Sequence, residues 1–376
     1  MISKMNILVT GGAGFIGSFL CERLHSLGHS VSVLDNLDPQ VHPSGRPSYL
    51  APETELQLND IRDRDALARA VQDADTIVHC AAAVGVAQSL YRVHHFVGVN
   101  VGGTALLLEL LAERKRPLRK LLLFTSMTSY GEGLYRRQSD GALLRVGIRS
   151  ETDVQNYGWE PVDPQTGEVL RAVPTPENAT LMARNIYALT KRYQEELAFS
   201  VGITYNLPVV CLRLFNVYGP RQSLSNPYTG VLAIFLSRLL AGQAAVVYED
   251  GNQTRDFVSV HDVVNAAILA LEHSVVNGQV INIGSGEPRR INDCARDLAH
   301  LLGRDDIQPQ ISGKFRRGDV RHCFADISKA RQLLRYEPKT RWEDGLTELI
   351  QWAKSAPTAD RFGQAELELQ RHGLVR

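Results

Sequence analysis

Cysteine is scarce in this chain of 376 residues. The five cysteines are scattered and form no C-x-x-C pair; they are Cys21, Cys80, Cys211, Cys294 and Cys323. This spacing predicts neither a disulfide framework nor a zinc site, and a sparse, odd set is typical of the reducing cytoplasm. We therefore expect a cytoplasmic protein with no bound metal.

The chain also lacks an excess of charge of either sign, because 41 Lys and Arg residues balance 41 Asp and Glu residues. Nothing global indicates binding to nucleic acid or to a membrane surface, so any anionic ligand must be bound by local groups. The N-terminal apolar run is short and broken by glycines. No later run is expected to be long and apolar enough to cross a bilayer.

What the chain does contain is an alternation of short apolar runs and helical patterns. Strands are predicted at 5–10, 31–34, 76–79, 121–125, 209–214 and 280–283. Helices are predicted at 15–27, 62–72, 99–114, 183–201 and 263–273. This alternation predicts an α/β fold, a Rossmann doubly wound parallel sheet with helices on both faces.

A glycine-rich turn joins the first strand to the first helix. Gly12, Gly14 and Gly17 match G-x-G-x-x-G, and Gly11 precedes them. Glycine lets the backbone turn tightly and approach a pyrophosphate, which rests on the helix N-terminus. The motif is weak alone, but between a strand and a helix it predicts a dinucleotide site.

Asp35 ends the second strand. A carboxylate at this position accepts hydrogen bonds from a ribose diol and repels a 2′-phosphate. The residues that follow, Asn36 and Leu37, offer no cation for such a phosphate. The sequence therefore predicts NAD as the cofactor in preference to NADP.

The composition of the chain changes after Gly219, where a loop rich in proline and polar residues begins. We expect an NAD-binding domain at 1–217 continued by 256–284, and a smaller, discontinuous substrate domain at 218–255 and 285–356. Residues 357–376 are interpreted as a C-terminal tail.

The stretch 132–180 lacks periodicity and is interpreted as an insert in the first domain, since so long a loop is uncommon unless it is functional. It is expected to cover the ligand end of the site, with Arg145, Arg149, Tyr157 and Trp159 as candidate contacts. A surface excursion or a dimer contact is an equally weighted alternative.

Tyr187 and Lys191 lie four residues apart, which places them on one face of a helix. A free tyrosine has a pKa of about 10, and a nearby ammonium group is expected to lower it toward neutrality. The pair is therefore a candidate for acid–base chemistry. The same spacing also occurs on ordinary amphipathic helices.

Eight segments, in order, give the chain a resemblance to the extended short-chain dehydrogenase/reductase family, in its nucleotide-sugar epimerase and dehydratase branch. They are GGAGFIG, HCAAAVG, TSMTSYG, YALTK, RLFNVYGPRQ, GNQTRDFVSVHDVV, INIGSGE and RRGDVRHCFADISKA. Within that branch, DNLDPQVH, AAAVGVAQS, YGEGLY and SNPYTGVLAIF are similar to dTDP-L-rhamnose 4-epimerase-like enzymes.

The resemblance implies roles for the matching residues. The catalytic residues would be Ser126, Tyr187 and Lys191. The residues that would bind NAD are Gly11, Gly14, Phe15, Ile16, Gly17, Asp35, Asn36, Asp60, Ile61, Ala81, Ala82, Ala83, Asn100, Tyr187 and Lys191. The substrate would meet Ser126, Thr128, Phe215, Asn216, Arg255 and Arg316, of which the two arginines suit a diphosphate.

The implied activity is that of an NAD-dependent nucleotide-sugar 4-epimerase, an isomerase that works as a homodimer. A 4,6-dehydratase would need an acid and a base directly after Ser126, but Met127 has no proton to give and Thr128 is a poor base. A uronic acid decarboxylase would need a dedicated motif, and none is recognised.

An alternative of another class is a non-catalytic NAD sensor on the same fold. Such relatives usually lose the tyrosine or the lysine, and both are present here. The nucleotide and the sugar stay open.

Overall fold

The computed structural model describes residues 4–52, 54–226, 228, 230–316, 318–356, 360 and 362–374. At its centre is a seven-stranded sheet in the order β13-β9-β5-β4-β1-β2-β3, and each neighbouring pair is parallel. The strands are β1 (Asn6–Thr10), β2 (Ser30–Asp35), β3 (Glu55–Leu58), β4 (Thr76–His79), β5 (Lys120–Ser126), β9 (Val209–Leu214) and β13 (Gln279–Ile283). The predicted Rossmann α/β fold is confirmed.

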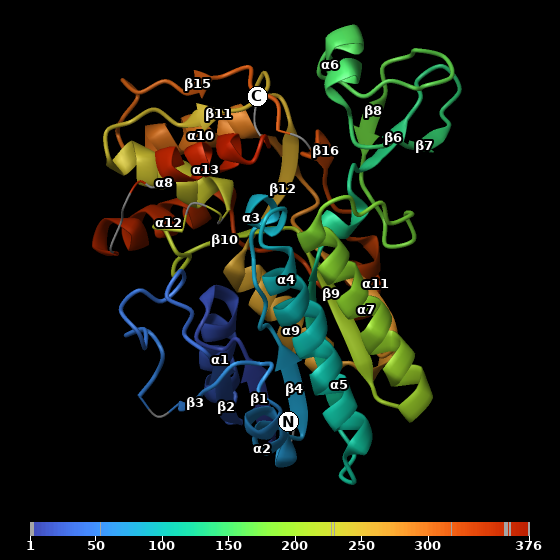
Figure 1. The fold of residues 1–376 in the computed structure, drawn as a ribbon, viewed down its shortest axis with the longest axis vertical. Coiled ribbons are helices and arrows are strands. Elements are labelled where there is room, and N and C mark those ends of the chain that lie inside the picture. The colour runs from blue at the N-terminus through green and yellow to red at the C-terminus, as the bar shows by residue number, and fades with distance from the viewer. Residues whose placement is uncertain are drawn as a thin grey trace.

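Helices cover both faces of this sheet (Figure 1). One face packs against α1 (Phe15–Ser26), α9 (Val260–Glu272) and α11 (Ser328–Leu334), and the other against α2 (Arg64–Gln72), α5 (Gly103–Glu113) and α7 (Ile186–Tyr205). Ile7 and Val9 of β1 belong to the first core, and Leu8 between them belongs to the second. Because successive strand side chains point to opposite faces, an unbroken apolar strand suits a sheet covered on both sides.

The helix before β5 corrects one expectation. The segment Val93–Glu113 joins α4 (Val93–Phe96), a π-helical stretch (Val97–Gly102) and α5, and it is long and apolar enough by composition to cross a membrane. The prediction that no run has these properties is therefore wrong. Leu107, Leu108 and Leu111 of this helix are buried in the core shared with α2 and α7, as expected of a helix that packs on a sheet.

A second hydrophobic core lies beyond the carboxyl edge of the sheet. It is formed by α8 (Val231–Leu240), α10 (Ile291–Leu301) and α12 (Trp342–Ser355). Beside it are β10 (Asn216–Tyr218), β12 (Thr254–Ser259), β14 (Pro288–Arg290) and β16 (His322–Cys323), with β11 (Val246–Val247) paired to β15 (Gln310–Ile311). Elsewhere in the chain are three short helices, α3 (Val86–Ser89), η2 (Met127–Tyr130) and η3 (Ser274–Val276), and the C-terminal helix α13 (Phe362–Arg371).

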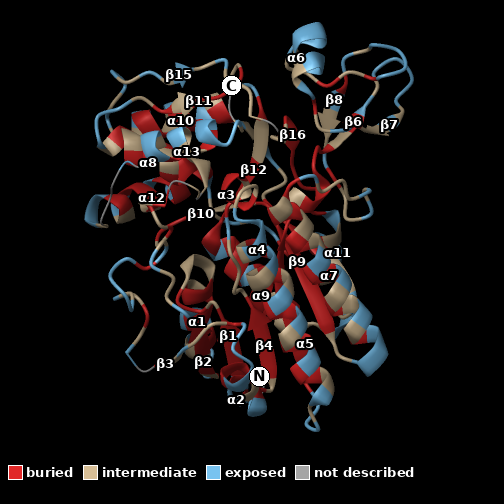
Figure 2. Cartoon of the chain, viewed as in Figure 1, coloured by how far each residue is buried: buried red, intermediate tan, exposed pale blue. Residues whose placement is uncertain are grey.

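The insert at 132–180 folds into a small lobe of its own. The strands β6 (Leu134–Arg136), β7 (Leu143–Arg145) and β8 (Arg171–Val173) form an antiparallel sheet, and α6 (Glu151–Tyr157) follows β7. The lobe stands apart at the upper right of Figure 1 and is largely exposed in Figure 2. The short strands, of three residues each, explain why periodicity did not reveal them.

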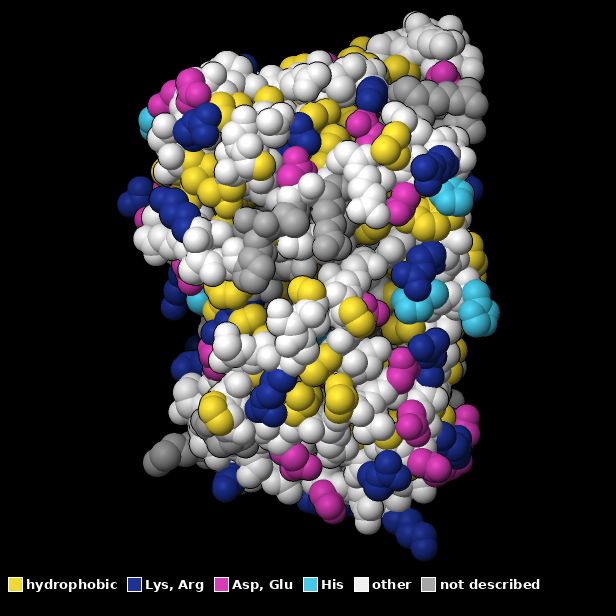
Figure 3. Space-filling model, turned by 60° about the vertical axis from the view of Figure 1, so that its left-hand side comes forward, with side chains coloured by type: hydrophobic (Ala, Val, Ile, Leu, Met, Phe, Trp, Pro, Cys, Tyr) yellow, Lys and Arg dark blue, Asp and Glu magenta, His cyan; other side chains and the backbone are white. Residues whose placement is uncertain are grey.

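Buried ion pairs connect this lobe to the second core. The fully buried Arg321 bonds Glu160 of the lobe, and its Nη1 lies 2.8 Å from Glu249 and 2.6 Å from Asp250. Arg149 of the lobe bonds Glu249 at 2.8 Å. On the exposed face drawn in Figure 3, acidic and basic side chains are interspersed, in keeping with the balanced total charge.

Candidate active site

A cavity of about 650 Å³ lies between the carboxyl edge of the large sheet and the second core. This is the edge at which open α/β sheets bind ligands. Every residue to which the family resemblance gave a role toward cofactor or substrate lines this cavity except Asn100. Residues far apart in the chain, such as Gly11, Tyr187 and Arg316, are thereby brought to one space.

The glycine turn lies at one end of the cavity. Gly11 has a φ of +70°, and its amide donates to the carbonyl of Leu34 at 2.8 Å. A Cβ on Gly17 would lie 2.3 Å from the Gly11 carbonyl oxygen, closer than atoms approach one another. Only glycine fits there, and α1 begins directly behind the turn, so the exposed backbone N–H groups of its first turn suit a pyrophosphate.

Asp35 is positioned by backbone amides at the end of β2. Its Oδ2 accepts a hydrogen bond from Ala13 at 3.0 Å and its Oδ1 one from Leu37 at 2.9 Å. Each carboxylate oxygen keeps a further lone pair with which to accept from a ribose hydroxyl. The residues of this end of the cavity therefore fit a dinucleotide with a free 2′-hydroxyl.

Asp60 follows β3 and is held by two neighbours. The Nε of Arg62 lies 2.8 Å from Asp60 Oδ1, and Asn36 donates to Oδ2 at 3.3 Å. The hydrogen bond from Arg62 is the main cause that lowers the pKa of Asp60 to about 2. Asp60 is consequently ionised at neutral pH and oriented at the cavity wall beside Ile61.

Asn100 differs from its expected place, because it lies behind the wall of the cavity and does not line it. It belongs to the π-helical stretch 97–102. Its Oδ1 accepts from the Ala83 amide at 2.8 Å, and its Nδ2 donates to Thr190 at 2.9 Å. Asn100 thus links Ala83 to Thr190 of α7, and its contact with a cofactor stays a prediction.

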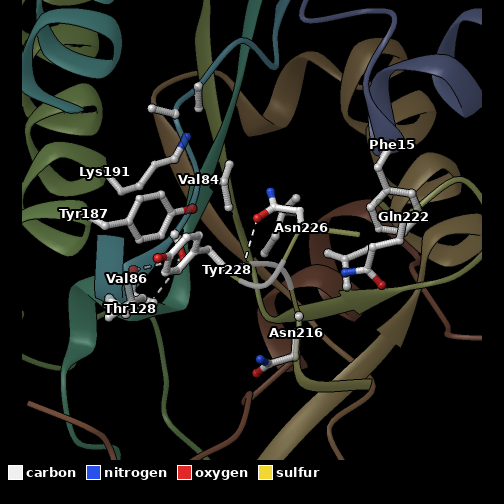
Figure 4. A pocket seen from close by; sticks show the side chains of 18 of the residues that line it. Phe15, Val84, Val86, Thr128, Tyr187, Lys191, Asn216, Gln222, Asn226 and Tyr228 are labelled. Atoms are coloured by element: carbon white, nitrogen blue, oxygen red, sulfur yellow. Dashed lines mark hydrogen bonds between the residues drawn. The ribbon is translucent and has the colours of Figure 1, made fainter. Parts of the chain in front are cut away.

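The three predicted catalytic residues all line the cavity, and Figure 4 shows Tyr187 and Lys191 projecting into it from α7. Lys191 Nζ donates to the Phe124 carbonyl at 3.0 Å. Ser126 ends β5, and its Oγ accepts from Thr128 Oγ1 at 3.0 Å.

Burial dominates the electrostatics of this group. It raises the pKa of Tyr187 to about 12, and a hydrogen bond with Ser126 lowers the value only in part. Burial also lowers the pKa of Lys191 to about 8. The direction for Tyr187 is opposite to the one expected from the sequence, because desolvation of the phenolate outweighs the hydrogen bond with Ser126.

Two residues that line the substrate side, Asn216 and Arg316, carry polar atoms that are unpaired within the described part of the chain. Asn216 Oδ1 and Arg316 Nε are buried and have no hydrogen-bond partner among the described residues. The Arg316 guanidinium stacks on the Tyr248 ring at 4.8 Å. Arg255, by contrast, is oriented by its own surroundings, with its Nη1 2.9 Å from the Thr254 carbonyl and its Nη2 2.5 Å from the Val320 carbonyl.

Several further cavity residues were not predicted from the sequence. They are chiefly on the substrate side and include Gln222, Asn226, Tyr228, Tyr248, Gln253, Phe362 and Leu369. Gln253 stands in GNQTRDFV, two residues before Arg255, so the strand period of two gave a signal that could have found it. No local pattern marks Phe362 or Leu369.

The insert contributes less to the cavity than expected. Of residues 132–180, all of which are described, only Ile148 lines it. Arg145 donates to the carbonyls of Tyr130 and Glu132, and Arg149 is paired with Glu249. Tyr157 is exposed, and Trp159 offers its carbonyl to Arg149. None of these four residues lines the cavity, which favours the alternative of a surface excursion or a dimer contact.

Comparison with known proteins agrees with this geometry. The model of the NAD dependent epimerase/dehydratase family matches residues 7–145 and 157–284. The chain belongs to this family, and the resemblance and the NAD cofactor predicted from the sequence are confirmed at that level.

Two similar proteins differ in activity. A dTDP-L-rhamnose 4-epimerase of Burkholderia thailandensis is 37% identical over 94% of this chain and 96% of its own length. A UDP-N-acetyl-alpha-D-glucosaminuronate decarboxylase of Bacillus cytotoxicus is 31% identical over 93% of this chain and 98% of its own.

Among solved structures, the UDP-glucose 4-epimerase of Thermotoga maritima with UDP-glucose superposes with a TM-score of 0.76. It is 31% identical and covers 93% of this chain and 99% of its own. The UDP-glucuronic acid 4-epimerase of Bacillus cereus, in complex with UDP-glucuronic acid and NAD, gives a TM-score of 0.74 at 28% identity, with the same coverage.

Proposed function

We propose that this protein is an NAD-dependent nucleotide-sugar 4-epimerase, an isomerase. The observation that carries the proposal is that Ser126, Tyr187 and Lys191 line one cavity together with the glycine turn and with Arg255 and Arg316. A redox cofactor and an anionic sugar derivative can therefore meet at a tyrosine. The 37% identity to a dTDP-L-rhamnose 4-epimerase supports this choice.

In this proposal the turn at Gly11, Gly14 and Gly17 holds the pyrophosphate of NAD, and Asp35 binds its adenosine ribose. Ala81–Ala83 and Lys191 lie along the rest of the cofactor. NAD held by these residues would supply the acceptor for the hydride of carbon 4 and the donor that returns it to the sugar. Arg255, Arg316 and Asn216 bind the diphosphate, which leaves the sugar beside Ser126 and Thr128.

Tyr187 is proposed to remove the proton of the 4-hydroxyl group and to give it back. Because burial raises its pKa to about 12, the phenolate needs positive charge close by. Lys191 supplies an ammonium group whose own pKa of about 8 keeps much of it charged near neutrality. Ser126 orients the sugar hydroxyl for the transfer.

The residues after Ser126 do not provide the acid and the base that a dehydratase needs. The side chain of Met127 is buried in the core below the sheet edge. The Thr128 hydroxyl donates a hydrogen bond to Ser126, and as an alcohol it is a poor base. A decarboxylase is the second candidate, because a decarboxylase is among the similar proteins.

The homodimer is also a proposal. Apolar side chains are exposed along α4, the π-helical stretch and α7, where Val93 is 42%, Val97 42% and Ile203 84% exposed. Two copies that pair these faces would bury them in a four-helix contact. The balanced charge and the scattered free cysteines support a cytoplasmic location.

The domain division is proposed as predicted, with 1–217 and 256–284 around the large sheet and 218–255 and 285–356 around the second core. The separate hydrophobic clusters on the two sides of the cavity support it. Part of the stretch assigned as a tail is the helix α13.

The test is incubation with a panel of nucleotide sugars deuterated at carbon 4, without added reductant. A 4-epimerase returns an epimer that keeps its deuterium, because the same cofactor gives the hydride back within one site. Release of carbon dioxide from a uronic acid substrate would favour the decarboxylase. Release of a 4-keto-6-deoxy sugar would favour a dehydratase, and no turnover of any sugar would favour the sensor.

A further inference from the structure

The C-terminal helix α13 borders the cavity from the substrate side. Phe362 and Leu369 are seven residues apart, hence on one face of the helix, and both line the cavity. Leu369 is 4% exposed and packs in one cluster with Tyr248 of the substrate side and Ala87 of α3, which follows β4. The helix therefore touches segments from both sides of the cavity.

Glu368 joins the same two sides through hydrogen bonds. Its Oε2 accepts from the Tyr91 hydroxyl at 3.1 Å and from the Tyr228 hydroxyl, and the two tyrosyl oxygens lie 2.7 Å apart. Tyr91 follows α3, whereas Tyr228 precedes α8. The Tyr91 ring also stacks on His372 at a centroid distance of 4.5 Å. A single carboxylate thus fastens α13 across the cavity.

Tyr228, one of the two tyrosines that bond Glu368, lies near the candidate catalytic residues. A Cβ on Gly85 would lie 3.2 Å from the Cβ of Tyr228, and Gly85 lines the cavity between Val84 and Val86. Figure 4 shows Tyr228 at the same end of the pocket as Tyr187 and Thr128. The hydrogen bonds of Glu368 therefore reach the end at which the sugar is proposed to lie.

The Leu369 end of the arrangement is near the candidate diphosphate group. Leu369 packs with Tyr248, and the Tyr248 ring carries the guanidinium of Arg316. A ligand that is bound by Arg316 and oxidised beside Tyr187 extends from one residue to the other. Helix α13 lies along this part of the cavity.

Other contacts of α13 are the Arg238 guanidinium, 4.8 Å from the centroid of the Phe362 ring, the buried Ala365, and two ion pairs at the edge of the substrate side. Glu366 pairs with Lys314 at 2.5 Å, and Asp360, just before the helix, pairs with Arg238 at 3.2 Å. Partly exposed pairs of this kind stabilise little. The apolar contacts of Phe362, Ala365 and Leu369 and the hydrogen bonds of Glu368 therefore place the helix.

We propose that α13 forms the outer wall of the nucleotide-sugar site, where Phe362 and Leu369 contact the ligand and Glu368 is the positioning residue that holds the wall closed. The inference rests on the proposed function. A wall that bridges both sides of the cavity slows the release of ligand. It also retains the oxidised sugar in the site while the sugar rotates to present its other face.

The experiment compares Leu369→Ala with Leu367→Ala, a change of the same size two residues away on the exposed side of α13. UDP and dTDP serve as probes, and their dissociation rates are measured by stopped-flow fluorescence on the full chain. Leu369→Ala should release the better-bound nucleotide about tenfold faster, the scale of losing contact with about two buried methylene groups. Leu367→Ala should release it at the parental rate.

Equal release rates in the parental protein and Leu369→Ala would overturn the inference while leaving the proposed function intact. If the parental protein binds neither nucleotide, GDP and ADP replace them as probes, and binding of none of the four would contradict the proposed function. Because nucleotide release needs no turnover, these two failures are distinguishable.

Glu368 is tested by hydrogen exchange over residues 362–371 together with nucleotide release. Glu368→Ala should speed both the exchange of the α13 amides and the release, because both phenol contacts are lost. Glu368→Gln keeps a carbonyl acceptor for Tyr91 and Tyr228, so it should restore release close to the parental rate. Parental exchange and release in Glu368→Ala would contradict its positioning role.

Discussion

On the side of the large sheet, the cavity residues follow directly after strands β1, β2, β4 and β5, whereas on the substrate side they come from β10, α8, the approach to β12, the loop before β16 and α13. The first set is placed by the ladder of a parallel sheet, which brings the carboxyl ends of its strands to one edge. The second set is placed by side-chain contacts between segments that are distant in the sequence.

The two sides of the cavity also differ in the buried polar groups behind them. Behind the sheet side, neutral groups form a chain in which His79 Nδ1 lies 2.7 Å from Thr10 Oγ1 and His79 Nε2 lies 2.9 Å from Thr104 Oγ1. Behind the substrate side, the fully buried Arg321 binds three carboxylates. The sheet side also contains a buried ion pair, between Arg213 of β9 and Glu195 of α7, whereas on the substrate side a single arginine binds three carboxylates.

The largest effect is expected from breaking the charge network of the substrate side. Arg321→Met leaves Asp250, Glu160 and Glu249 without their shared cation, which should cost about 3–5 kcal/mol of the free energy of unfolding. Denaturant titration measures this loss. Arg304→Met, at an exposed pair, should cost less than about 0.5 kcal/mol. Equal stability of the two variants would remove the proposed difference between the sides.

The next effect concerns the tyrosine at which the two sides meet. Tyr187→Phe keeps the ring but removes the oxygen that moves the proton, so kcat should fall by about 10²-fold or more, or about 2.7 kcal/mol in the barrier. NAD binding should persist. Tyr193→Phe, on the exposed face of the same helix, should keep full activity. An active Tyr187→Phe enzyme would exclude Tyr187 as the acid and base.

Gly17→Ala tests the backbone of the sheet side. The added Cβ would meet the Gly11 carbonyl at 2.3 Å, so the turn must open and NAD affinity should fall by at least about tenfold, or about 1.4 kcal/mol. Equilibrium dialysis with NAD measures this, and binding of UDP or dTDP should change little. Gly147→Ala has no atom within 4 Å of its Cβ and serves as the control. Unchanged NAD affinity in Gly17→Ala would count against the assigned turn.

A smaller effect is expected on the pH dependence of the free energy of unfolding, through the neutral network of His79 on the sheet side. Burial is the main cause that lowers the pKa of His79 to about 3, and its value in the unfolded chain is about 6.5. Below pH 6.5 the unfolded chain therefore binds a proton that the folded chain does not. Stability is lost as the pH falls, by about 1.4 kcal/mol per pH unit from this group.

Unfolding titrations between about pH 7 and about pH 5 check this slope. His79→Gln should reduce it, and His300→Gln at an exposed site should not. If the slope of His79→Gln matched the parental slope, His79 would not be the group responsible.

The sequence located the glycine turn, Asp35 and the Tyr187–Lys191 pair because each depends on local geometry. A tight turn requires glycine at fixed spacing, and residues four apart share a helix face whatever surrounds them. The helix boundaries were less accurate. The helix expected at 183–201 runs from Ile186 to Tyr205, since Asn185 provides the N-cap hydrogen bond and Asn206 adopts the left-handed conformation that ends it.

Side-chain direction was decided only in the folded structure. Arg145 and Arg149 are cations beside a site that binds anions, yet one bonds backbone carbonyls and the other a buried carboxylate. Asn100 bonds the rear of the wall that it was expected to line.

The sequence by itself thus determined the fold class, the cofactor and the candidate acid–base pair, because strand periodicity, glycine spacing and helix spacing are set by neighbours along the chain. Only the tertiary structure decided which arginines face the cavity, that desolvation raises the pKa of Tyr187, and that the C-terminal helix borders the substrate site. These properties depend on long-range contacts and on burial, which no short segment encodes.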